Sequence, residues 1–89
     1  MPLIEVPRRY RLPTSGLAQI PVSGATVRAC LEFAEAEHPG FGELVLDGDG
    51  DLRRFVTLFV NGELLRRDGL DQPVDAADTI TVVAAAAGG

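Results

Sequence analysis

Only one stretch of this 89-residue chain has the apolar periodicity of a helix, and that limits the folds available to it. Apolar residues recur at the i, i+3, i+4 and i+7 spacing of one helix face, and they are Val27, Cys30, Leu31 and Ala34. Thr26 before this stripe is a good N-cap by type, and Pro39 and Gly40 end the pattern after His38. Because a single helix covers only one face of a sheet, the chain is predicted to be an α+β protein with one helix packed on one face.

Five runs around that helix have the composition and alternation of strands. They cover residues 3–6, 17–22, 54–62, 63–66 and 79–83. The third run is the strongest, and the Asn61-Gly62 pair at its end predicts a tight hairpin turn. This order of elements favours a β-grasp arrangement, a mixed sheet of four to five strands whose first and last strands lie parallel at the centre. The domain is expected to span residues 1–83.

The composition argues against several functional classes. A net charge of −5 disfavours nucleic-acid binding, which needs a basic surface, and fits a basic partner better. No apolar run approaches membrane-spanning length, and the N-terminus lacks a secretory signal pattern, so no membrane association and a cytoplasmic location are expected. All eight basic residues are arginines, which leaves no lysine for Schiff-base chemistry or for linking copies of this chain.

The polar segments do not form a recognisable catalytic or metal site. Cys30 lies within the apolar stripe and is expected to be a buried thiol rather than a nucleophile. Residues 47–51 imitate the start of a calcium loop, but Leu52 and Leu58 occupy positions where that loop needs a glycine and a bidentate glutamate. A flexible acidic loop is the better interpretation. No pairing of a nucleophile with a base is evident, so a free-standing enzyme is not expected.

Two surfaces are candidates for contact with a partner. If Val56, Leu58 and Val60 face the helix, Phe55 and Phe59 lie on the open face of the sheet as a docking patch. Alternatively, these two aromatics cover a small second core under the loops. The basic segment 8–11 could bind an acidic partner or could be a solvated face.

The chain ends in a run of very small residues. Beyond Val83, no side chain is larger than a methyl group. Residues 84–89 are therefore expected to be a flexible tail that can enter a narrow channel, with Gly88 and Gly89 free to take any backbone conformation. Fully extended, these residues span up to about 20 Å. The reactive group that this tail would deliver is the Gly89 carboxylate, and the alternative is an idle, frayed chain end.

Together these features resemble the MoaD/ThiS family of ubiquitin-like sulfur carrier proteins, over essentially the whole chain. The segments that carry the resemblance are 59–63, 69–74, 78–82 and 86–89. The stretch from Arg54 to Asn61, the acidic loop before it and the Ala-Gly-Gly end look like the CysO-type branch of this family. That branch supplies sulfur for cysteine biosynthesis, and related carriers serve sulfur-containing secondary metabolites.

The resemblance implies a carrier with no catalytic residues and no bound cofactor of its own. A ubiquitin-activating-like adenylyltransferase would use ATP to adenylate Gly89, and Gly88 would leave the reacting carbonyl unobstructed. Sulfide, or a sulfurtransferase such as a rhodanese, would then displace AMP and leave a thiocarboxylate for a sulfur-accepting biosynthetic enzyme. Ala85, Ala86 and Ala87 would thread the tail into these partners. A metallohydrolase able to trim the C-terminus would be a further partner.

Other functions share this kind of tail. A protein modifier would be joined through Gly89 to a lysine of a target protein. The small subunit of molybdopterin synthase would stay bound to a large catalytic subunit, which the long 47–51 loop and the lack of a larger apolar patch disfavour. A plain structural β-grasp domain would keep its function when Gly89 is removed. The receiving pathway is left open by the sequence.

Overall fold

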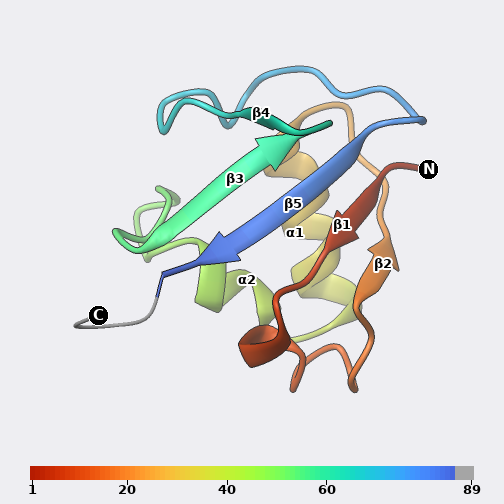
Figure 1. Cartoon of the computed structure of the whole chain (residues 1–89), viewed down its shortest axis with the longest axis vertical. Helices are drawn as coiled ribbons and strands as arrows, with labels where there is room; N and C mark the ends of the chain where they lie inside the picture. The colour runs from red at the N-terminus through yellow and green to blue at the C-terminus, as the bar shows by residue number, and fades with distance from the viewer. Residues whose placement is uncertain (86–89) are drawn as a thin grey trace.

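The computed structural model describes residues 1–85, which form a five-stranded mixed sheet with two α-helices against one face (Figure 1). The strands are β1 (Leu3–Glu5), β2 (Gln19–Pro21), β3 (Val56–Val60), β4 (Glu63–Leu64) and β5 (Thr79–Ala84), in the spatial order β2-β1-β5-β3-β4. The central pair β1 and β5 is parallel, and the other neighbouring strands are antiparallel. The predicted β-grasp arrangement is therefore confirmed.

The strongest predicted strand is the buried strand β3. Its residues alternate between buried and half-buried positions, with Val56, Leu58 and Val60 on the helix side as expected. Asn61 and Gly62 both have positive φ, 51° and 82°, which is the geometry of a two-residue hairpin turn. The returning strand β4 is shorter than predicted.

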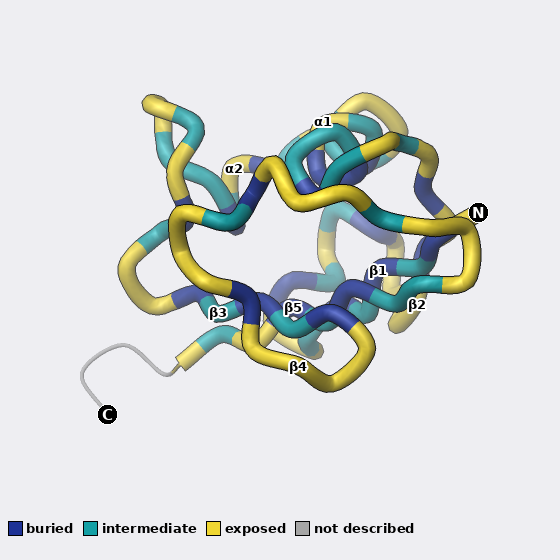
Figure 2. The backbone as a smooth tube through the Cα atoms, turned by 90° about the horizontal axis from the view of Figure 1, so that it is seen from above, coloured by how far each residue is buried: buried dark blue, intermediate teal, exposed yellow. Residues whose placement is uncertain are grey.

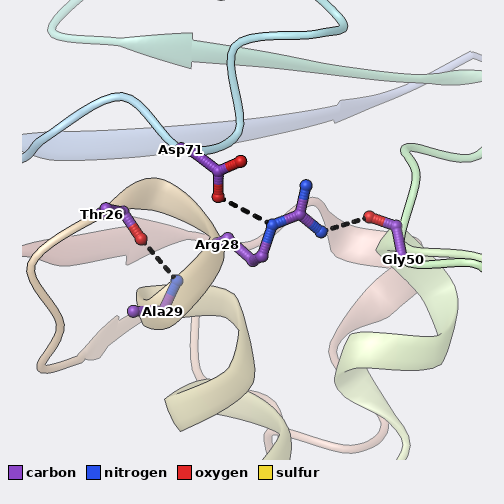
Figure 3. Close-up of polar contacts among 5 residues, drawn as sticks. All are labelled: Thr26, Arg28, Ala29, Gly50 and Asp71. Carbon is purple, nitrogen blue, oxygen red and sulfur yellow. Dashed lines mark hydrogen bonds and ion pairs between the residues drawn. The ribbon is translucent and has the colours of Figure 1, made fainter.

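Helix α1 (Val27–Glu37) forms where the periodicity predicted it. The Thr26 hydroxyl accepts a hydrogen bond from the Ala29 N–H at 3.1 Å, which satisfies one of the free donors in the first turn (Figure 3). All four residues of the predicted stripe are fully buried. Cys30 is among them, and burial raises the pKa of its thiol, in agreement with an unreactive structural cysteine.

The prediction of a single helix was wrong, because a second helix, α2 (Phe41–Val45), follows directly. Gly40 has a φ of 100°, which reverses the chain direction between the two helices. The Glu35 carboxylate accepts hydrogen bonds from the N–H groups of Gly40 and Gly42 and thereby caps α2. A five-residue helix is too short to show a helical period, so its sequence does not predict it. A 3₁₀ turn, η1 (Arg8–Tyr10), also follows β1.

The acidic segment 47–51 folds back on itself. The Asp47 carboxylate accepts hydrogen bonds from the N–H groups of Asp49 and Asp51, and these bonds lower the pKa of Asp47. Arg28 joins this segment to the body of the protein, because its guanidinium donates to the Gly50 carbonyl at 2.6 Å and to the Asp71 carboxylate at 2.9 Å (Figure 3).

The core lies between the sheet and the helices, where the buried positions concentrate in Figure 2. Among its fully buried side chains are Ile4, Ile80 and Phe41. Among residues 1–85, both α-helices lie on the same side of the sheet, and neither covers its opposite face (Figure 1). Within the part of the chain that the structure describes, no helix is long and apolar enough to cross a membrane.

Candidate functional site

The candidate site is the end of β5, from which the C-terminal residues continue. β5 has a neighbouring strand on each side, and it extends to Ala84, which pairs with Val56 at the start of β3. The Ala85 N–H donates a further hydrogen bond to the Phe55 carbonyl at 2.9 Å. The last described residue of the chain is thus held against the residue that precedes β3. Ala86, Ala87, Gly88 and Gly89 lie outside the described residues.

A surface hollow of about 420 Å³ adjoins this chain exit. It lies between η1 and α2, and its lining residues are Arg9, Tyr10, Gly40, Glu43, Leu44, Arg53, Phe55 and Ala85. We call it the exit hollow. The Arg9 guanidinium donates a long hydrogen bond, 3.5 Å, to the Ala85 carbonyl, and Arg53 donates from its Nε to the Glu43 carbonyl. Arginine side chains and apolar side chains therefore meet at the point where the chain leaves the sheet.

The two aromatic residues predicted to form one docking patch lie in different surroundings. Phe59 is on the open face of the sheet, opposite Leu64 of β4 and Thr81 of β5. Phe55 precedes β3 rather than lying within it, and it lines the exit hollow together with Leu44 of α2. Phe55 remains 45% exposed and Phe59 is half-buried.

Sequence reasoning missed two apolar residues of the open face. Leu64 is 66% exposed and pairs with Phe59, while Val83 is 42% exposed and pairs with Thr57. Paired residues on neighbouring strands point to the same side of a sheet, so these side chains extend the patch around Phe59. The Asn61-Gly62 turn fixes the pairing of Leu64 and could have revealed it. Val83 could not be placed before the order of the strands was known.

Neither Cys30 nor His38 lines the exit hollow. Cys30 is buried with its sulfur 3.7 Å from the Gly24 carbonyl oxygen, and His38 is the residue that ends α1. Within residues 1–85, no group of three histidine, cysteine, aspartate or glutamate side chains is arranged to hold a metal ion.

The model of the ThiS family matches residues 6–89, which is nearly the whole chain including Gly88 and Gly89. The chain belongs to the ThiS family. The resemblance seen in the sequence is therefore confirmed.

Relatives of this ThiS-family chain cover it almost end to end. It is 34% identical to the sulfur carrier protein CysO of Mycobacterium tuberculosis over 97% of this chain and 96% of that protein. It is 40% identical to a putative sulfur carrier protein of Archaeoglobus fulgidus over 91% of this chain and 97% of that protein. Its fold matches a chain in the crystal structure of the Amycolatopsis orientalis BexX/CysO complex, with a TM-score of 0.91, 31% identity and complete coverage of both chains.

Proposed function

We propose that this protein is a sulfur carrier whose C-terminal carboxylate is activated and converted to a thiocarboxylate. The observation that carries the proposal is the family match, which runs through the two C-terminal glycines. Relatives named as sulfur carriers, aligned over more than nine tenths of this chain, support it further. Neither of these two relatives is named as a protein modifier or as a molybdopterin synthase subunit.

The proposed chemistry takes place on the Gly89 carboxylate and in partner enzymes. The carboxylate attacks ATP in an adenylyltransferase, forming the acyl adenylate and releasing pyrophosphate. Sulfide attacks the acyl carbon and expels AMP, which leaves the thiocarboxylate. The persulfide of a sulfurtransferase would expel AMP in the same way, and a second thiol would then cleave the resulting acyl disulfide, forming a disulfide with the sulfurtransferase cysteine and releasing the thiocarboxylate. Without a β-carbon at Gly88 or Gly89, little obstructs the approach of the nucleophile. The carrier supplies the reacting group and no catalyst.

The fold acts as a rigid handle for this group. β5 is hydrogen-bonded on both sides, so the chain exit is fixed relative to the rest of the domain. The exposed apolar side chains of the open face, Phe59, Leu64 and Val83, would dock the carrier on its partners. Phe55 would contribute beside the exit, and Ala85 would be the first residue to enter the partner's channel, followed by Ala86 and Ala87.

The sulfur would be delivered to a biosynthetic enzyme in the cytoplasm. Likeness to CysO proteins favours cysteine synthesis, and a sulfur-containing secondary metabolite is the alternative product. In the first case, a metallohydrolase would trim the C-terminus after sulfur transfer. Both cases use the same activation step, so activation is the step to test first.

The test is the intact mass of the protein after incubation with ATP, sulfide and the adenylyltransferase from the same genome. The expected product is heavier by the difference between sulfur and oxygen, and fragmentation places this difference on Gly89. A variant that lacks Gly89, and one with an added residue after Gly89, should gain no mass. Both should keep the thermal stability of the wild type, because the buried core of residues 1–85 extends no further along the chain than Val82.

Three outcomes would contradict this function. Sulfur loading of the variant without Gly89 would exclude the terminal carboxylate as the reacting group. Conjugates with lysine residues of other proteins, in place of the thiocarboxylate, would identify a protein modifier. A wild-type chain left unchanged by an adenylyltransferase of proven competence would identify a β-grasp domain with an idle tail.

A further inference from the structure

Half of the arginines in this acidic protein lie in the two short segments, 8–9 and 53–54, whose residues Arg9 and Arg53 line the exit hollow. Four of the eight basic residues are Arg8, Arg9, Arg53 and Arg54, whereas the chain as a whole has a net charge of −5. The first two belong to η1, and the other two lie directly before Phe55, whose carbonyl holds Ala85. The rim around the last described residue is therefore a local basic surface on an acidic molecule.

These arginines are not neutralised by the protein's own carboxylates within residues 1–85. The ion pairs found there join Arg28 to Asp71 and Arg66 to Asp68. Glu43 is the only acidic residue among the described residues that line the exit hollow, and Arg53 binds its backbone carbonyl rather than its carboxylate. The guanidinium groups at the exit thus retain donors for another molecule.

The exit hollow combines these donors with an apolar wall. Tyr10 is almost fully buried, Leu44 packs against the core, and Phe55 is partly exposed. A guanidinium presents a planar fork that matches a carboxylate, and such a pair is stronger beside apolar groups than in open water. The group that fits best is therefore an aspartate or glutamate whose neighbour is aliphatic or aromatic.

The length of the remaining chain decides which molecule brings that carboxylate. The four residues beyond Ala85 can span at most about 14 Å. An enzyme that acts on Gly89 inside a channel must therefore press its channel mouth against the rim of the exit. The exit hollow lies on that rim, and it would be covered whenever the tail is engaged.

We propose that the exit hollow is a docking site for an acidic side chain at the mouth of the tail channel of the activating enzyme, and that Arg9 and Arg53 bind that side chain. The inference rests on the proposed sulfur-carrier function and names the chemistry of its partner. The negative net charge of the chain suggests a basic partner. At the exit hollow, however, the acidic carrier would present a basic region to an acidic side chain of this enzyme.

The experiment is ATP–pyrophosphate exchange catalysed by the adenylyltransferase of the same genome, with the carrier as the varied substrate. Arg9→Glu is expected to raise the KM for the carrier about tenfold, with little change in kcat, because a charge at an interface rim mainly affects association. Arg9→Gln should give an intermediate KM. The dependence of KM on salt concentration should be weaker for both variants than for the wild type.

The matched control is Arg66→Glu, which changes the net charge by the same amount at a side chain 85% exposed and outside the exit hollow. Its KM should stay within about twofold of the wild type, since steering depends on where a charge is placed. Equal thermal midpoints for the Arg9 and Arg66 variants would verify that both are folded.

Each of the other outcomes overturns the inference in a different way. Exchange with an equal KM for Arg9→Glu and Arg66→Glu would leave the carrier function standing and exclude the docking site. A lower KM for Arg9→Glu would indicate that the hollow holds the chain's own C-terminal carboxylate. No exchange with the wild-type carrier, by an enzyme of proven competence, would overturn the proposed function and the docking site together.

Discussion

Arg67 should contribute more to stability than any other arginine on the surface of this protein. Its guanidinium donates hydrogen bonds to three backbone carbonyls, those of Val56 at 2.9 Å, Leu52 at 3.0 Å and Arg53 at 2.6 Å. These carbonyls belong to the segment that leads into β3 and carries Phe55 toward the chain exit. One side chain therefore fixes the backbone against which Ala84 and Ala85 are held.

The size of the effect follows from these bonds. A hydrogen bond contributes about 1 kcal/mol net, and the two bonds to Val56 and Leu52 are partly shielded from water, whereas the third is exposed. We therefore expect Arg67→Ala to lower the free energy of unfolding by about 2 kcal/mol. For a domain of this size, that corresponds to a fall of roughly 8–16 °C in Tm.

Urea denaturation and thermal melting of Arg67→Ala would measure this loss. Arg66→Ala is the matched control, because within residues 1–85 the Arg66 side chain makes only an exposed ion pair with Asp68. This variant should melt close to the wild type. Hydrogen exchange adds a local measurement, in which the Ala85 amide should lose protection when Arg67 is removed. Equal melting of the Arg66 and Arg67 variants would refute the assignment of this stabilisation to the three carbonyl contacts.

Two further predictions concern the segment after α1. Gly42→Ala should lower the free energy of unfolding by about 1–3 kcal/mol in urea denaturation, because its new Cβ would lie 2.9 Å from the Glu35 Cβ. Gly48→Ala is the control, since its new Cβ meets no atom within 4 Å and the free energy of unfolding should change little. The pKa of Asp47 is lowered in the folded state, mainly by the hydrogen bond from the Asp51 N–H. The contribution of the ionised Asp47 carboxylate to stability is therefore fully present above its unfolded pKa and is lost as the pH falls through its folded-state pKa. Urea midpoints of the wild type and Asp47→Asn should therefore differ at neutral pH and converge in acid, and a constant difference would contradict this.

Much of the fold could be predicted from residues that are close together in the chain. The spacing of Cys30 and its stripe, the Thr26 cap and the Asn61-Gly62 turn each act over a few positions, and the structure confirms all three. Helix α2 escaped prediction because its stability depends on the Glu35 carboxylate of the preceding helix and on the left-handed backbone of Gly40, not on a period of its own.

The candidate site likewise has features that the sequence predicts and features that depend on the tertiary structure. The sequence by itself determined the small-residue tail ending at Gly89 and the family resemblance, because both reside in contiguous residues. Only the tertiary structure decided that Phe55 separates from Phe59 and joins Tyr10 at the chain exit, with Arg9 and Arg53 on the rim. The physical reason is strand pairing: β1 and β3 flank β5, so the turns that follow β1 and precede β3 meet where β5 ends, although they lie far apart in sequence.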